Sequence, residues 1–147
     1  MKVVVDTNII ISALMSRENA CRRILGMVFD GELFPLVGNA LFCEYEDVIS
    51  RDYLFEGCPF DTDRRNLFLD DFLSVCRWID IRYLWRPNLR DEADNHVFEL
   101  AVAGQAEKII TQNIKDFKSG EILFPDVEVI KPVDFILEKR RAEKWQH

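Results

Sequence analysis

Short runs of apolar residues alternate along this chain with longer stretches in which apolar residues recur at helical spacing. The first run, Val3-Val4-Val5, is continuous, which is typical of a strand buried on both faces of a parallel sheet. Comparable runs predict further strands at residues 33–37, 78–84, 108–111 and 127–130. Pro35 lies in the second strand and has no backbone N–H, so we expect that strand to lie at a sheet edge or to begin irregularly.

The stretches between these runs have the period and the end signals of helices. They predict helices at residues 7–14, 18–29, 40–50, 62–77, 91–103 and 133–145. Strands that alternate with helices indicate an α/β fold, here a three-layer α/β/α arrangement around a central, mainly parallel sheet. The length of 147 residues suits one domain spanning 1–147, and the sequence contains no linker or internal repeat.

Composition narrows the class of protein. Hydrophobic residues make up 48% of the chain and charged residues 31%, and no apolar run approaches the ~20 residues of a membrane span. The N-terminus has neither the basic segment nor the cleavage site of a signal peptide, so we expect a cytoplasmic protein that does not bind membranes. Four cysteines without a CxxC pair, together with two histidines, exclude a zinc-ribbon site.

The charge is acidic, with a net value of −7 and a pI near 4.9. This charge argues against non-specific binding to a nucleic-acid backbone. It does not exclude a nucleic-acid substrate, because carboxylates that hold divalent cations make a protein look acidic until the metal is counted. The positions of the acids are therefore more informative than their number.

Asp6 follows the first predicted strand directly, in the sequence Asp6-Thr7-Asn8. Ligands of open α/β sheets bind just beyond the carboxyl ends of such strands. A carboxylate buried beside a core strand is unfavourable unless its charge is neutralised, and a metal ion would do this. The alternative is that Asp6 or Thr7 only caps the helix that follows.

Two predicted helices carry further candidate acids. Glu44 and Glu46 lie on opposite flanks of the apolar stripe of helix 40–50, and periodicity does not choose between them. Asp94 lies near the start of helix 91–103, on the face that carries its core residues, which favours a carboxylate directed at the sheet. The alternative is a capping pair, with Asp91 at the N-cap and Asp94 three residues later.

A second polar cluster follows the predicted strand at 108–111 and includes Thr111, Asn113 and Asp116. Asn113 and Asp116 could equally be ordinary turn residues. Taken together, however, four carboxylates stand on four separate elements, namely Asp6, Glu44, Asp94 and Asp116. Oxygen ligands of this kind suit Mg²⁺ or Mn²⁺, which can activate water and stabilise the oxygens of a phosphoryl displacement.

The chain resembles the PIN-domain nucleases over nearly its whole length. The resemblance is carried by VVVDTNIIISAL at residues 3–14 and by RDEADNHVFELAVAGQAEKIITQNIKDF at residues 90–117. It is most similar to the branch of toxins from bacterial toxin–antitoxin pairs, related to VapC-type endoribonucleases. The resemblance implies Mg²⁺- or Mn²⁺-dependent hydrolysis of RNA, a small antitoxin protein as partner, and a homodimer.

The resemblance also implies roles for individual residues. Asp6, Glu44 and Asp94 match the first three acids of the family, and Asp116 matches its more variable fourth acid. The supporting residues that it implies are Thr7, Asn8 and Thr111, with Asp91 as a nearby reserve acid and Asn113 where many relatives have Asp. Candidates for phosphate contact are Arg22, Arg23, Arg86 and Arg90, and candidates for base stacking are Trp78, Trp85 and Phe117.

Other classes of protein fit the same residues less well. A haloacid-dehalogenase-like phosphatase needs a second acid two residues after the first, where this chain has Asn8. A response-regulator receiver needs paired acids near the end of the first strand and a phosphoacceptor Asp after a middle strand, and neither pattern is clear. A stronger alternative is a PIN fold that binds partners without hydrolysis, which Asn113 and the acidic pI favour.

Overall fold

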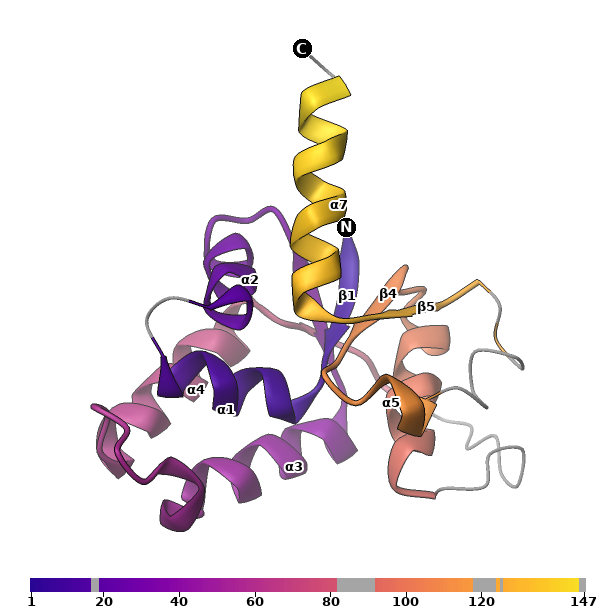
Figure 1. The fold of residues 1–147 in the computed structure, drawn as a ribbon. Coiled ribbons are helices and arrows are strands. Elements are labelled where there is room, and N and C mark those ends of the chain that lie inside the picture. Colours follow the sequence, from indigo (N-terminus) through magenta and orange to yellow (C-terminus); the bar gives the residue numbers. More distant parts are fainter. Residues whose placement is uncertain (17–18, 82–91, 118–123, 125, 146–147) are drawn as a thin grey trace.

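A parallel sheet with β1 at its centre organises the part of the chain that the structure describes (Figure 1). The structure is a computed structural model that describes residues 1–16, 19–81, 92–117, 124 and 126–145, with the backbone alone at 92–95. Five strands within these ranges form the sheet in the order β3-β2-β1-β4-β5, and every neighbouring pair is parallel. The strands are β1 (Lys2–Val5), β2 (Phe34–Val37), β3 (Arg77–Trp78), β4 (Lys108–Ile110) and β5 (Glu128–Ile130).

Helices cover the sheet on both sides, which confirms the predicted three-layer α/β/α arrangement. They are α1 (Thr7–Met15), α2 (Ala20–Phe29), α3 (Asn39–Ser50), α4 (Thr62–Val75), α5 (Glu92–Ala103) and α7 (Pro132–Trp145), with a 3₁₀ turn η1 at Asp52–Phe55. Helix α5 packs on β1, β2 and β4, whereas α1, α2, α3 and α4 gather on the other side of the sheet (Figure 1). Within the described residues, no helix is both long enough and apolar enough to cross a membrane.

The β1 strand is the most deeply buried element, as its continuous apolar run predicts. Val3, Val4 and Val5 are all fully buried, and β1 is paired on both sides, to β2 and to β4. The hydroxyl of Tyr45, from α3, donates a hydrogen bond to the backbone oxygen of Val5. This contact attaches helix α3 to the carboxyl end of the central strand.

The β2 strand corrects one prediction. Pro35 does not place β2 at an edge, because β2 lies between β1 and β3. The N–H of Phe34 donates to Met1 of the neighbouring strand, so the nitrogen of the next residue, Pro35, faces the other side. On that side β3 begins to pair only at Leu36, and the missing N–H therefore interrupts no ladder.

Other departures from the predicted elements are small. The third strand is shorter than predicted, because β3 ends at Trp78, and residues 82–84 lie outside the described part of the chain. Helix α3 begins one residue early, so Gly38 rather than Asn39 occupies its N-cap. Leu67, an apolar residue of α4, is nevertheless 63% exposed.

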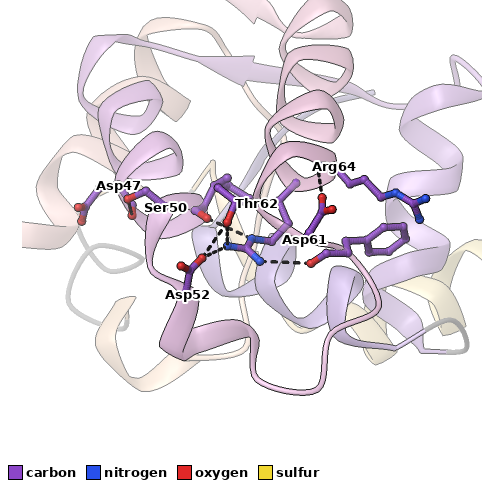
Figure 2. A network of polar contacts seen from close by, with 9 residues as sticks. Asp47, Ser50, Asp52, Asp61, Thr62 and Arg64 are labelled. Carbon is purple, nitrogen blue, oxygen red and sulfur yellow. Dashed lines mark hydrogen bonds and ion pairs between the residues drawn. The ribbon is translucent and has the colours of Figure 1, made fainter.

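Arg65, on helix α4, holds the segment that follows α3 by several hydrogen bonds. Its guanidinium is almost fully buried and donates to the backbone oxygens of Ile49 and Phe60, both at 3.2 Å. It also donates to Asp52 Oδ1 and lies over the ring of Phe55. Figure 2 shows Asp52 and Thr62 side by side, and the hydroxyl of Thr62 donates to the same Asp52 carboxylate at 3.0 Å.

The capping of α4 completes this network. Asp61 is the N-cap residue, and its carboxylate accepts a hydrogen bond from the backbone N–H of Arg64 at 2.9 Å (Figure 2). The Asp61 side chain thus marks the start of α4. One turn later, Arg65 donates hydrogen bonds to two backbone carbonyl oxygens that would otherwise lack this donor.

We expect Arg65→Met to lower the free energy of unfolding by about 3 kcal/mol, because it leaves two backbone oxygens without their donor. Arg64→Met, at the exposed neighbouring position, is the matched control and should change stability little. Urea unfolding of both variants measures the difference. Equal effects of the two substitutions would show that the buried network contributes nothing specific.

Candidate functional site

Asp6 lies at the carboxyl end of β1, where the open-sheet rule places ligands. Its backbone N–H continues the β1–β4 ladder by donating to Ile110 at 3.0 Å. Its side chain caps helix α1, because Oδ1 accepts a hydrogen bond from the backbone N–H of Thr7 at 2.8 Å. Capping and a ligand-binding role are therefore compatible, since capping uses only one of the two carboxylate oxygens.

The second oxygen of Asp6 is held from two other positions. Thr111, fully buried just after β4, donates its hydroxyl to Asp6 Oδ2 at 2.7 Å. Asn8 donates its side-chain amide to the same oxygen at 3.1 Å and to the Thr111 hydroxyl at 3.2 Å. Asn8 and Thr111, which lie 103 positions apart in the sequence, thus orient one carboxylate.

The electrostatic environment of Asp6 is unfavourable to its charge. Asp6 is only 8% exposed, and this burial raises the pKa of its carboxyl group above the usual value. The hydrogen bonds from Thr111 and Thr7 oppose the increase, while the nearby Glu44 carboxylate adds to it. The donors to Asp6 described above are neutral groups, so they orient the carboxylate without cancelling its charge.

Glu44 is the second acid that the fold brings to this position. It projects from α3, and its Oε1 accepts a hydrogen bond from the Thr7 hydroxyl at 2.9 Å. Its Oε2 lies 2.8 Å from Nε2 of His96, on α5. The hydrogen bond from His96 is the largest cause of a lowered pKa for Glu44, which favours its ionised form. Glu46, the alternative on the other flank of the helix, is exposed.

Thr7 joins the two acids through different atoms. Its backbone N–H contacts Asp6 and its hydroxyl contacts Glu44. The two carboxylates, from β1 and α3, therefore lie on either side of a single residue at the start of α1. Because the two carboxylates are close, the charge of Glu44 adds to the effect of burial in raising the pKa of Asp6.

The remaining predicted site residues are placed less completely. Asp94 lies in the first turn of α5, but its side chain is outside the described part, as is the whole of Asp91. The convergence of Asp94 on Asp6 thus stays a prediction. Asn113 is exposed and its backbone N–H donates to the Thr111 hydroxyl at 3.1 Å. Asp116 is exposed and lines a pocket that also includes Lys115, Lys131 and Asp134.

The described side chains supply part of a metal site. Among them, no group of three or more His, Cys, Asp or Glu residues is arranged to hold a metal ion. Asp6 and Glu44 together offer carboxylate oxygens, which is the donor chemistry that Mg²⁺ and Mn²⁺ prefer. The pair fits such a cation, and a third carboxylate would have to come from residues whose side chains are not described, of which Asp94 is the predicted one.

Two residues at the site have no signal in the sequence pattern. His96 contacts Glu44, and Tyr45 attaches α3 to β1, but neither a period nor a motif distinguishes them from other polar and aromatic residues of their helices.

Several secondary candidates lie elsewhere. Phe117 is a buried core residue that packs against Phe98, and Trp78 packs edge-on against Phe42. Arg22 donates to the Ala13 backbone oxygen, and Arg23 lines a surface pocket with residues of α7. Arg86, Arg90 and Trp85 lie outside the described residues.

We expect Thr111→Val to destabilise the metal-free protein by about 2 kcal/mol at neutral pH, because it removes a donor to a buried charged group. A raised folded-state pKa means that the ionised Asp6 opposes folding above that pKa and no longer does so once the pH falls below the unfolded value. The loss caused by Thr111→Val should therefore shrink on acidification.

Urea unfolding at neutral and mildly acidic pH measures this dependence. Thr111→Ser, which keeps the hydroxyl, is the control and should show a smaller and pH-independent effect. A loss in Thr111→Val that is the same at both pH values would mean that the hydroxyl does not act on the Asp6 charge.

One known protein family matches most of this chain. A family model described as PIN domain matches residues 2–115, which is most of the chain and includes Asp6, Glu44 and Asp94. No curated protein matches the sequence.

Among solved structures, the chain is similar to one in the crystal structure of VapBC2 from Rickettsia felis bound to a DNA fragment from their promoter. The TM-score is 0.60 at 18% sequence identity, and the match covers 89% of this chain and 98% of that chain. At this identity the similarity shows the fold alone, which is the one that the sheet order and the helical layers already describe. Because the PIN domain model covers more than three quarters of its residues, the chain belongs to the PIN domain family.

Proposed function

We propose that this protein is a Mg²⁺- or Mn²⁺-dependent endoribonuclease that hydrolyses RNA phosphodiester bonds in the cytoplasm, as the toxin of a toxin–antitoxin pair. The observation that carries the proposal is the arrangement of Asp6 and Glu44 on either side of Thr7 at the carboxyl end of the central strand. Burial, and to a smaller extent the charge of Glu44, raises the pKa of Asp6 in the metal-free protein, and a divalent cation would offset both effects.

The proposed site divides its work among a few residues. Asp6, Glu44 and Asp94 would hold the cation, with Asp116 as a fourth acid nearer the solvent. When bound, Mg²⁺ or Mn²⁺ lowers the pKa of water and offsets the charge that develops on phosphoryl oxygens. Thr111 and Asn8 keep the Asp6 carboxylate in one orientation through Oδ2, and Oδ1, which accepts only from Thr7, keeps one lone pair for a cation.

A neighbouring pocket offers a path for the substrate. Residues 112–116 line it together with Lys131 and Asp134, directly after the strand that carries Thr111. Lys115 and Lys131 are exposed there and could contact the phosphates of an RNA strand that extends from the acids. Asn113, in this same segment, leaves the site with one negative charge fewer than many relatives have. The proposal therefore requires one bound cation and does not depend on a second.

An antitoxin is the proposed partner. The solved VapBC2 structure of similar fold supports this proposal, and so does an apolar groove of about 530 Å³ between α2 and α4. Phe29 and Leu67 line the groove with exposed side chains. Arg22 also lines it, and its Nη2 atom is buried with no hydrogen-bond partner among the described residues. We propose that an antitoxin helix with an apolar stripe occupies this groove.

The family also implies a homodimer. We expect light scattering of the purified protein to give twice the mass of the 17.3 kDa chain, and a monomeric mass would remove this part of the proposal.

We expect Mn²⁺ to stabilise the wild-type protein against heat. At about 100 times its Kd, a cation adds about 2.7 kcal/mol, which raises the Tm of a chain of this size by about 5–10 °C. Asp6→Asn should abolish the increase, and Glu44→Gln should reduce it. Since protons compete with the cation for Asp6, the increase should diminish as the pH falls through the raised pKa of that residue.

Glu46→Gln is the matched control, because Glu46 lies on the same helix as Glu44 but is exposed. It should leave the Mn²⁺ effect unchanged.

Cleavage of RNA by the purified protein should require Mn²⁺ or Mg²⁺ and be lost in Asp6→Asn. Cleavage that persists in Asp6→Asn would indicate a contaminating nuclease, and Mn²⁺ binding without cleavage would favour a PIN-fold binding module.

We expect Leu67→Glu to weaken the binding of the antitoxin, taken as the product of a small adjacent gene, by at least about tenfold, because it places a charge in the apolar groove. Leu137→Glu, on the exposed side of α7, is the control and should bind normally. Titration calorimetry measures both affinities. Unchanged binding by Leu67→Glu would place the partner on another surface, and the lack of a small adjacent gene would count against a toxin–antitoxin pair.

A further inference from the structure

His96, on α5, contacts the candidate metal ligand Glu44 and is not itself one of the four candidate acids. Its Nε2 atom lies 2.8 Å from Oε2 of Glu44. The other Glu44 oxygen, Oε1, accepts from the Thr7 hydroxyl at 2.9 Å. Glu44 is therefore held at both oxygens by residues of two different helices, α1 and α5.

The contact defines which nitrogen of His96 carries a proton. An ionised carboxylate only accepts hydrogen bonds, so Nε2 must be the donor. The other nitrogen, Nδ1, is buried and has no hydrogen-bond partner among the described residues. A metal ligand needs an unprotonated nitrogen that reaches the cation, and His96 offers none, because Nε2 is protonated and Nδ1 is enclosed by the protein.

Glu44 needs such support more than Asp6 does. Asp6 has a short side chain at a helix N-cap and is 8% exposed, whereas the side chain of Glu44 is 35% exposed and has one more rotatable bond. A ligand that must be immobilised on binding loses conformational entropy, and a ligand already held in place loses less. Each hydrogen bond occupies one lone pair of a carboxylate oxygen, so both Glu44 oxygens keep another for a cation.

We propose that His96 is a positioning residue that holds Glu44 in its metal-binding orientation through the Nε2–H···Oε2 hydrogen bond. The inference rests on the proposed function, because it assumes that Glu44 binds the cation. His96 itself contacts neither the cation nor the substrate. Its effect is on the affinity of the site for the metal, as hydrogen bonds to metal ligands have in other proteins.

The alternative is that His96 only packs α5 against α3. Two amide substitutions separate these possibilities, because Gln places an N–H near the position of Nε2, whereas Asn places one near that of Nδ1. His96→Gln should preserve the hydrogen bond to Glu44, and His96→Asn and His96→Leu should lose it. Loss of packing alone would affect all three variants without regard to the position of the N–H.

The test is the affinity for Mn²⁺ alone, measured on metal-free protein by titration calorimetry. We expect the Kd to increase by about 10- to 100-fold in His96→Asn and His96→Leu, and to stay near the wild-type value in His96→Gln. Thermal unfolding in the absence of metal identifies any variant that does not fold. Should His96→Leu fail to fold, the comparison of Gln with Asn still decides the question.

The outcomes separate this inference from the proposed function. A wild-type protein that does not bind Mn²⁺ would overturn the proposed function itself. Wild-type binding that Asp6→Asn abolishes, together with equal affinities in all three His96 variants, would leave the metal site in place and overturn the role of His96. Equal weakening in Gln and Asn would likewise overturn it, because the position of the N–H would then not matter.

Discussion

The burial of one carboxylate, that of Asp6, at the end of the central strand is the constraint to which the rest of the site responds. Burial disfavours the charge, and the neutral groups of Thr7, Asn8 and Thr111 orient the carboxylate while leaving the charge in place. The protein thus retains an anion in its interior that the surrounding structure only partly stabilises. Such an arrangement is unfavourable for stability alone, and groups with perturbed pKa values of this kind are typical of functional sites.

Glu44 strengthens this interpretation, because the fold places a second acid next to the first instead of a basic residue. The two carboxylates repel each other, yet their pKa values move in opposite directions: burial raises that of Asp6 and the hydrogen bond from His96 lowers that of Glu44. The surroundings of Glu44 therefore favour its charge, whereas those of Asp6 disfavour it. Both acids lie within the residues that the PIN domain model matches.

Much of this arrangement could be predicted from the sequence, because a continuous Val run identifies a central parallel strand and the rule for open sheets places Asp6 at its functional end. The choice between Glu44 and Glu46 could not, since both flank the apolar stripe and only the packing of α3 against α1 and α5 decides which one faces inward. His96 was missed because a contact between two helices leaves no period in either of them. Pro35 misled because the extent of a neighbouring strand, not the proline itself, determines whether a backbone N–H is needed.

The hydrogen bond between Thr111 and Asp6 spans 105 positions of the chain. During synthesis, Asp6 emerges early and Thr111 only after three quarters of the polypeptide has been made. A nascent or truncated fragment that ends before β4 lacks both the strand that pairs with β1 on this side and the donor that most lowers the pKa of Asp6. The site is therefore assembled late, because the Asp6 carboxylate gains its donor from Thr111 only when most of the chain is present.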